Sequence, residues 1–146
     1  MGNKNKTSVV MKWYRIERFC YEHHLKFIAN LIYHFIQIIF GCTIPYSAVF
    51  EKGVNFAHFH GIVINQKTFI KTGTLIYQNV TIGGTKKGSP IIGKNCIIGS
   101  GAVILGNVTL GDNVKIGANA VVLKDVPSNC TAVGIPAKVI TSKKLN

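Results

Sequence analysis

A six-residue repeat in the second half of the chain constrains its fold more than any other feature. From residue 92 to residue 127 the sequence divides into the hexads "IGKNCI", "IGSGAV", "ILGNVT", "LGDNVK", "IGANAV" and "VLKDVP". The first position of every hexad is a branched aliphatic residue, and the fifth is small or β-branched. The first positions are Ile92, Ile98, Ile104, Leu110, Ile116 and Val122, and the fifth are Cys96, Ala102, Val108, Val114, Ala120 and Val126.

A period of six fits neither an amphipathic helix nor an alternating strand. It is typical of a solenoid in which each hexad forms a short strand and a turn, so that stacked coils bury their aliphatic side chains. The intervening glycines and asparagines suit corners that need a positive φ. The sequence therefore predicts an all-β solenoid over residues 42–146, preceded by a short helical segment over residues 1–41.

Two irregularities interrupt this rhythm upstream. Ten residues, rather than six, separate Ile82 from Ile92, which predicts a loop within "GGTKKGSP". A second slip, of two residues, falls in the stretch "NFAHFHGIVIN". The in-phase positions before Ile82 are Ile76, Ile70, Ile64 and His58, and those before the slip are Phe56, Phe50 and Ile44. Because irregular loops of repeat proteins often carry the binding site, we expect these two regions to serve one site.

The segments "HFHGIVIN", "YQNVTIGGT", "VVLKDVP" and "VGIPAKV" resemble the left-handed β-helix hexapeptide-repeat acyltransferases. Within that family they resemble the serine acetyltransferase-like group, which includes short O-acetyltransferases of capsule and surface-polysaccharide clusters. The resemblance covers roughly residues 42 to 141. It implies a left-handed parallel β-helix, a homotrimer, and acetyl-CoA as the cosubstrate.

The resemblance assigns His58 as the general base. In the family this histidine takes the proton of the acceptor hydroxyl while that oxygen attacks the acetyl thioester. Imidazole suits the task because its pKa lies near neutrality, and an alcohol is a weak nucleophile until its proton is removed. The alternative is a surface or structural histidine, which the register slip disfavours. His60 lies on the same face if the stretch is extended, and it either lines the acceptor site or only contacts solvent.

The chain departs from the serine enzymes at several positions. Ala57 replaces the acid before the catalytic histidine, and Thr43 replaces the acid one coil earlier that orients the imidazole. Their Asp-Arg-His-Pro element is shortened to "KKGSP", which places Ser89 before the proline. These losses remove groups that would hold a free amino acid, so we expect a different acceptor, a sugar hydroxyl, bound near His60, Ala57 and Ser89. Glu51, the nearest acid in sequence, or else a backbone carbonyl, is expected to orient His58.

The resemblance also indicates where acetyl-CoA binds, in a groove between neighbouring subunits. Small residues there let the pantetheine arm approach the backbone. Lysines either meet the nucleotide phosphates or are only solvated. The implied cofactor-binding residues are Gly84, Thr85, Ser100, Lys115, Ala118, Pro136 and Lys138.

A metal site is not expected, although γ-class carbonic anhydrases share this fold. Their zinc needs three histidines, and here only His58 and His60 lie within the predicted solenoid.

The chain carries 17 Lys and Arg against 5 Asp and Glu, which suggests anionic partners. It has no helix-turn-helix or RNP motif, so nucleic acid is not expected. The four cysteines form no C-x-x-C pair, which is typical of reduced, buried thiols in a cytoplasmic protein.

The segment from Trp13 to Phe40 has apolar residues at the spacing of a helix with a broad apolar face. It is too short and too interrupted to span a membrane. It either packs on the solenoid or a partner subunit, or lies on a membrane with Arg15, Arg18 and Lys26 near anionic headgroups. Gly41 is predicted to close this helix, and Pro45 to begin the first coil.

Together these features predict an acetyl-CoA-dependent O-acetyltransferase acting on a sugar of a surface-polysaccharide pathway. It would be a cytoplasmic trimer, with peripheral membrane contact through the helix as one option. Serine O-acetylation for cysteine synthesis is the alternative within the same class. A non-catalytic hexapeptide-repeat scaffold is the alternative outside it.

Overall fold

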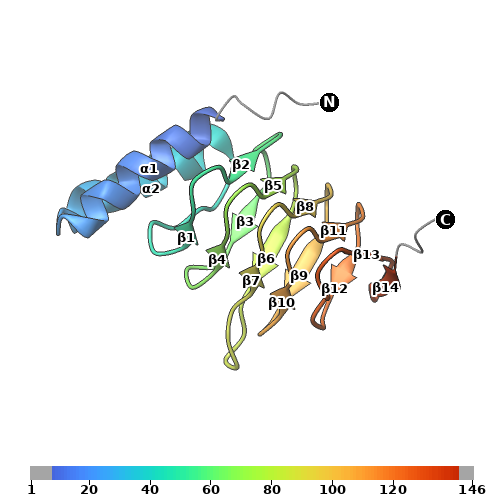
Figure 1. Ribbon diagram of the computed structural model, residues 1–146. Helices are drawn as coiled ribbons and strands as arrows, with labels where there is room; N and C mark the ends of the chain where they lie inside the picture. The colour runs from blue at the N-terminus through green and yellow to red at the C-terminus, as the bar shows by residue number, and fades with distance from the viewer. Residues whose placement is uncertain (1–7, 142–146) are drawn as a thin grey trace.

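The computed structural model describes residues 8–141, which form a helical hairpin followed by a β-solenoid of three parallel sheets (Figure 1). The helices are α1 (Val9–Glu22) and α2 (Lys26–Phe40). The first sheet contains β1 (Val49–Phe50), β4 (Phe69–Ile70), β7 (Ile91–Ile92) and β10 (Thr109–Leu110). The second contains β2 (Asn55–Phe56), β5 (Leu75–Ile76), β8 (Ile97–Ile98), β11 (Lys115–Ile116), β13 (Cys130–Val133) and β14 (Lys138–Thr141). The third contains β3 (Val63–Ile64), β6 (Thr81–Gly83), β9 (Val103–Leu105) and β12 (Val121–Val122).

Each strand pairs in parallel with the equivalent strand of the next coil, and β14 alone among the described strands runs antiparallel, against β13. The prediction of an all-β solenoid is therefore confirmed. The outer ends of the two predicted segments, residues 1–7 and 142–146, lie outside the described residues.

The aliphatic residue at the first position of each hexad forms the core. These side chains stack directly above one another, as in the column of Ile76, Ile98 and Ile116 on the second sheet. Those at the centre of the solenoid are completely buried. Residues with positive φ form the corners, including Asn79 and Gly101, at 58° and 70°. One aliphatic side chain per strand and one tight corner per turn therefore account for the regular coils.

The two-residue slip is confirmed. Phe56 pairs with Ile76, and Ile64 pairs with Ile82, so the coil takes eight residues between β2 and β3 where the next coil takes six. The extra pair lies in the corner at residues 57–62, which carries both histidines.

The predicted loop is also confirmed. It leaves the solenoid between β6 and β7, and Thr85 and Gly88 pair across it in a small antiparallel bridge. Figure 1 shows it projecting beyond the neighbouring corners. The loop joins the third sheet to the first, whereas the histidine corner joins the second sheet to the third. The two irregularities therefore lie on opposite edges of the third sheet.

The single helix predicted from Trp13 to Phe40 is instead a hairpin of two helices. The amides of His23 and Leu25 bond back to the carbonyls of Phe19 and Cys20, which ends α1. His24 then takes a positive φ of 61° and reverses the chain. Apolar spacing alone missed this break because the periodicity is similar on both sides of it. The second helix ends at Phe40, and Gly41 follows in the left-handed conformation, as predicted.

The hairpin covers the N-terminal end of the solenoid (Figure 1). Apolar side chains of both helices, among them Met11 and Ile36, belong to the same buried cluster as Ile44 of the first coil. The Tyr14 hydroxyl donates a hydrogen bond of 2.6 Å to the carbonyl of Ala48, and Arg18 donates one of 2.9 Å to that of Tyr46. The helices therefore close the end of the core.

Glu17 is buried at this junction. Its side chain is 0% exposed, and neither carboxyl oxygen has a hydrogen-bond partner among the described residues. Burial raises the pKa of Glu17 to about 8, and the nearby backbone of Tyr46 lowers it only in part. A buried carboxyl group without a partner is far more stable protonated than ionised.

Replacing the buried Ile98 by Ala is expected to lower the free energy of unfolding by roughly 2–5 kcal/mol, because the change leaves a cavity in the aliphatic column. Urea denaturation would measure the loss. Ile91→Ala is the matched control, since Ile91 is 42% exposed and its truncation is expected to cost less than about 1 kcal/mol. Equal losses would contradict the inward orientation of the first hexad position.

Because Glu17 is buried, we expect the free energy of unfolding to fall as the pH rises. The folded state keeps the proton up to a pKa of about 8, whereas the unfolded state loses it near the ordinary value of 4.5. Its contribution to stability is therefore complete below the unfolded pKa, and it declines by about 3 kcal/mol between pH 5 and pH 8. Denaturation across this range should show Glu17→Gln losing less stability than the unsubstituted chain. Parallel pH profiles would contradict the assignment.

Candidate active site

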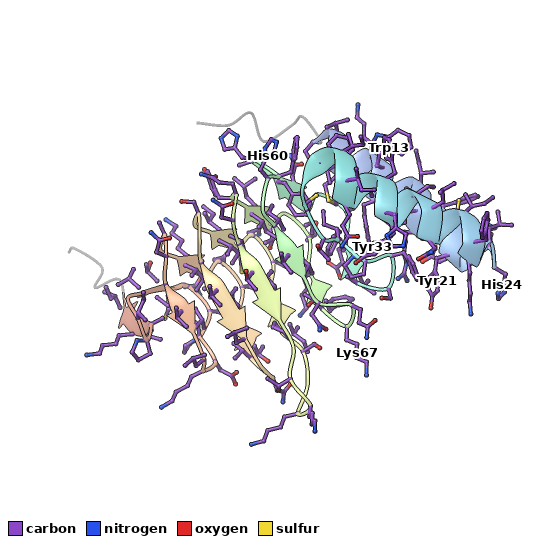
Figure 2. The ribbon with its side chains drawn as sticks, turned by 180° about the vertical axis from the view of Figure 1, so that it is seen from behind. Trp13, Tyr21, His24, Tyr33, His60 and Lys67 are labelled. Atoms are coloured by element: carbon purple, nitrogen blue, oxygen red, sulfur yellow. The ribbon has the colours of Figure 1, made fainter. Side chains whose placement is uncertain are left out.

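His58 lies in the two-residue insertion and is exposed. Its neighbour Phe59 is half-buried and meets Phe40, at the end of α2, edge to face with ring centroids 5.4 Å apart. His60 stacks on Phe59 at 4.5 Å, and Figure 2 shows its ring at the outer edge of the solenoid beside the hairpin. The His58 ring itself lies 6.5 Å from that of Tyr77 in the next coil. Aromatic contacts therefore anchor the insertion and leave the imidazole accessible.

Glu51 is not hydrogen-bonded to His58 in the structure. Glu51 follows β1 at the corner before β2, and its carboxylate accepts a hydrogen bond of 2.8 Å from the amide of Thr72 in the next coil. Thr43, at the other expected orienting position, accepts a bond of 3.3 Å from the side chain of Gln37. Among residues 8–141 no side chain is hydrogen-bonded to the His58 ring. The expectation that Glu51 orients the imidazole is therefore not met within one chain.

The histidine corner begins a column that runs along one edge of the solenoid. The carbonyls of His60, Gln78 and Ser100 each accept a bond of 2.9–3.0 Å from an amide of the next coil, so the three residues occupy equivalent places. Ala118 takes the next place, because Ile98 and Ile116, two residues before Ser100 and Ala118, pair directly. We call this column of four residues the histidine edge. Two of the predicted cofactor-binding residues thus lie in line with the histidines.

Pro136 and Lys138 lie at the far end of the histidine edge. The turn that contains Pro136 follows β13, and hydrogen bonds join it to Val121 of β12. Lys138 begins β14 opposite Val133. Lys115, in contrast, is exposed on the face of the second sheet, where it borders a cleft of about 650 Å³. Lys138 therefore lies next to the turn that ends the histidine edge, whereas Lys115 lies on the second sheet.

Gly84, Thr85 and Ser89 belong to the projecting loop, on the opposite edge of the third sheet. The Ser89 hydroxyl donates a hydrogen bond of 2.8 Å to the side-chain oxygen of Asn65, and a Cβ at Gly84 would come within 2.6 Å of that hydroxyl. These contacts fold the loop against the neighbouring coil. Within one chain the loop does not meet His58, so the expected single site is not assembled by one chain.

Gln78 lies on the histidine edge and is not among the residues predicted from the sequence. It lies between His60 and Ser100 on the histidine edge, and its side-chain oxygen is shielded from solvent without a hydrogen-bond partner among the described residues. This oxygen is an unused acceptor, and the side chain must turn toward solvent before a ligand can reach it. The hexad register could have indicated this position, since Gln78 precedes the corner asparagine just as Ser100 precedes Gly101.

Three further findings concern metal ligands, cysteines and membrane spans in the described part of the chain. No group of three His, Cys, Asp or Glu side chains within residues 8–141 is close enough together to hold a metal ion. All four cysteines are buried and unpaired, as the sequence predicts. Neither helix of the hairpin is long and apolar enough to cross a membrane.

Comparisons with known proteins identify the family. A sequence family described as "Bacterial transferase hexapeptide (six repeats)" matches residues 89–124. The serine acetyltransferase of Synechococcus elongatus is 41% identical over 131 residues, which cover 87% of this chain and 54% of that protein. The serine acetyltransferase of Helicobacter pylori is 39% identical over 135 residues, which cover 90% of this chain and 79% of that protein. The chain belongs to the serine acetyltransferase family.

Solved structures of the family confirm the left-handed β-helix fold. A serine acetyltransferase in complex with CoA matches with a TM-score of 0.84 and 36% identity, over 90% of this chain and 55% of that one. The soybean serine acetyltransferase complexed with serine matches with a TM-score of 0.85 and 35% identity. The match covers 90% of this chain and 56% of the soybean chain. The chain thus spans about half the length of several family members. These relatives favour the serine alternative over the capsule-polysaccharide subgroup expected from the sequence.

Proposed function

We propose that this chain is an acetyl-CoA-dependent O-acetyltransferase in which His58 is the general base. The observation that carries the proposal is the exposed imidazole of His58, anchored in the corner from which the histidine edge starts, in a chain of the serine acetyltransferase family. A family member crystallised with CoA supports the choice of acetyl donor. The non-catalytic scaffold has no comparable support, because it gives no reason for the insertion that presents His58.

The reaction needs one proton acceptor and one anion stabiliser. A neutral ring nitrogen of His58 takes the hydroxyl proton of the acceptor as its oxygen attacks the acetyl carbonyl. The developing oxyanion is stabilised by a backbone N–H of a coil corner. When the carbon–sulfur bond breaks, the thiolate of coenzyme A takes the proton back from the imidazolium. The ester and the free thiol are then the products, and His58 is neutral again.

Ser100, Ala118 and Pro136 are proposed to line the pantetheine and adenine path along the histidine edge, with Lys138 near the phosphates. Gly84 and Thr85 lie on the opposite edge of the third sheet, so their predicted contact with the cosubstrate requires a second copy of the chain. We therefore propose a homotrimer in which the loop of one subunit faces the histidine edge of its neighbour. The cytoplasmic location expected from the cysteines also stays a prediction.

Serine is the acceptor that the family favours, since one solved relative is complexed with serine. A sugar hydroxyl is the second candidate, and a specific observation supports it. The positions at which the resemblance places the serine enzymes' acids carry Ala57 and Thr43, and the carboxylate of Glu51 is already bonded to Thr72. A free amino acid needs ionic partners for its charged groups, whereas a sugar needs only hydrogen bonds.

Replacing His58 by Ala is expected to lower the rate of acetyl transfer by about two to four orders of magnitude, because the hydroxyl loses its proton acceptor. The measurement is release of coenzyme A thiol in the presence of acceptor. His60→Ala, in the same corner, is the matched control and should keep activity within about tenfold. A His58→Ala variant with full activity would refute the mechanism, whatever the acceptor.

A thiol-release assay with acetyl-CoA, and with serine, a panel of sugars or no acceptor, is expected to show turnover with serine. Turnover with a sugar and not with serine would establish the second candidate. If no acceptor is used, binding of coenzyme A measured by calorimetry decides between an untested acceptor and a scaffold. Absence of both turnover and binding would refute the proposed function.

A further inference from the structure

The outer side of the hairpin is unusually apolar. Phe27, Leu31 and Ile38 are 83%, 62% and 80% exposed, and their spacing places them on one face of α2. Ile39 extends this surface, while Ile16 and Phe19 are exposed on the adjoining helix α1. We call these six side chains the hairpin face. Single exposed apolar residues are ordinary, but a contiguous group of this kind indicates a contact surface.

The hairpin face is not the side of the helices that packs on the solenoid. The opposite sides of the same helices already bury Val10, Met11, Tyr14 and Ile36 against the solenoid. A helix that packs on one side of a soluble protein normally carries polar residues on the other. In α2 the outward positions instead hold Phe27 and Ile38, the two most exposed large apolar side chains of the chain's described part.

Basic residues border the hairpin face. Lys12 and Arg15 are exposed and lie one turn before Ile16 and Phe19 on the same side of α1, and Lys26 precedes Phe27. Of the two acids in the hairpin, Glu17 is buried, and Glu22 is paired with Arg18 at 2.7 Å. The rim of the face is therefore positive, with no free exposed carboxylate within the described helices.

Charge distinguishes the possible occupants of this surface. A second copy of the chain would place the same three cations opposite one another, which is unfavourable. A membrane that contains anionic phospholipids would instead attract them while accepting the apolar side chains. The helices have 14 and 15 residues, and a membrane span needs about 20, so they can lie on a bilayer but not cross it.

We propose that the hairpin face binds the surface of an anionic phospholipid membrane. Phe27, Leu31 and Ile38 enter the boundary between headgroups and acyl chains, and Lys12, Arg15 and Lys26 stay at the level of the phosphates. Because Phe59 packs on Phe40 at the end of α2, the histidine corner would be held close to the bilayer. The inference goes beyond acetyl transfer and does not depend on the identity of the acceptor.

Co-sedimentation with vesicles tests the proposal on the full chain. We expect binding to vesicles of phosphatidylcholine with phosphatidylserine, and little binding to phosphatidylcholine alone. Phe27→Ser combined with Ile38→Ser should weaken binding by roughly tenfold or more, because two apolar anchors are lost. Lys12→Gln combined with Arg15→Gln should weaken it by roughly thirtyfold, and added salt should have a similar effect.

Matched controls lie on the far coils. Leu123→Ser removes an exposed apolar residue, and Lys94→Gln combined with Lys124→Gln removes two exposed charges, so neither variant should change vesicle binding. Melting temperatures confirm that every variant is folded. Failure of the unsubstituted chain to bind, or equal effects of hairpin and control variants, would overturn the proposal. So would analytical ultracentrifugation showing that Phe27→Ser with Ile38→Ser dissociates an oligomer, since the face would then join copies of the chain.

Discussion

The parallel stacking of one aliphatic side chain per strand sets the geometry of everything else in this chain. Ile76, Ile98 and Ile116 lie directly over one another, and their backbones exchange hydrogen bonds with the next coil at every step. Stacked coils of this kind cannot shift by one residue without turning the aliphatic side chains outward. The register is therefore fixed, and any extra residues must be accommodated at a corner.

Function in this fold follows from such corners. A regular corner has one residue before the turn, such as Gln78 or Ser100. The two additional residues after Ala57 create a wider corner, and Phe59 anchors it on Phe40 of the hairpin. The packing of the helices on the first coils thus also fixes the place of His58. Stability of the end of the solenoid and placement of the imidazole depend on the same contacts.

The sequence was sufficient for the solenoid, the loop after β6 and the slip at the histidines, because each of these is a matter of counting along the chain. The sequence did not show which side chains lie near one another around a coil. Glu51 is close to His58 in sequence, but β2 and its two corners lie between them, and the carboxylate bonds to Thr72 instead. The loop and the histidine corner likewise belong to different edges of the third sheet. The break at His24 was missed because local hydrogen bonds, not apolar spacing, end α1.

No carboxylate of residues 8–141 is hydrogen-bonded to His58, and this bears directly on the acceptor. In a general base, a second group usually fixes which ring nitrogen carries the proton. Here Thr43 is engaged by Gln37, and Ala57 has no polar group to offer. The orienting contact therefore comes from a neighbouring copy, from the acceptor, or not at all. An acceptor rich in hydroxyl groups can supply both the proton that His58 is proposed to remove and a second hydrogen bond that holds the ring. Free serine could do so only if its charged ends find partners outside this single chain.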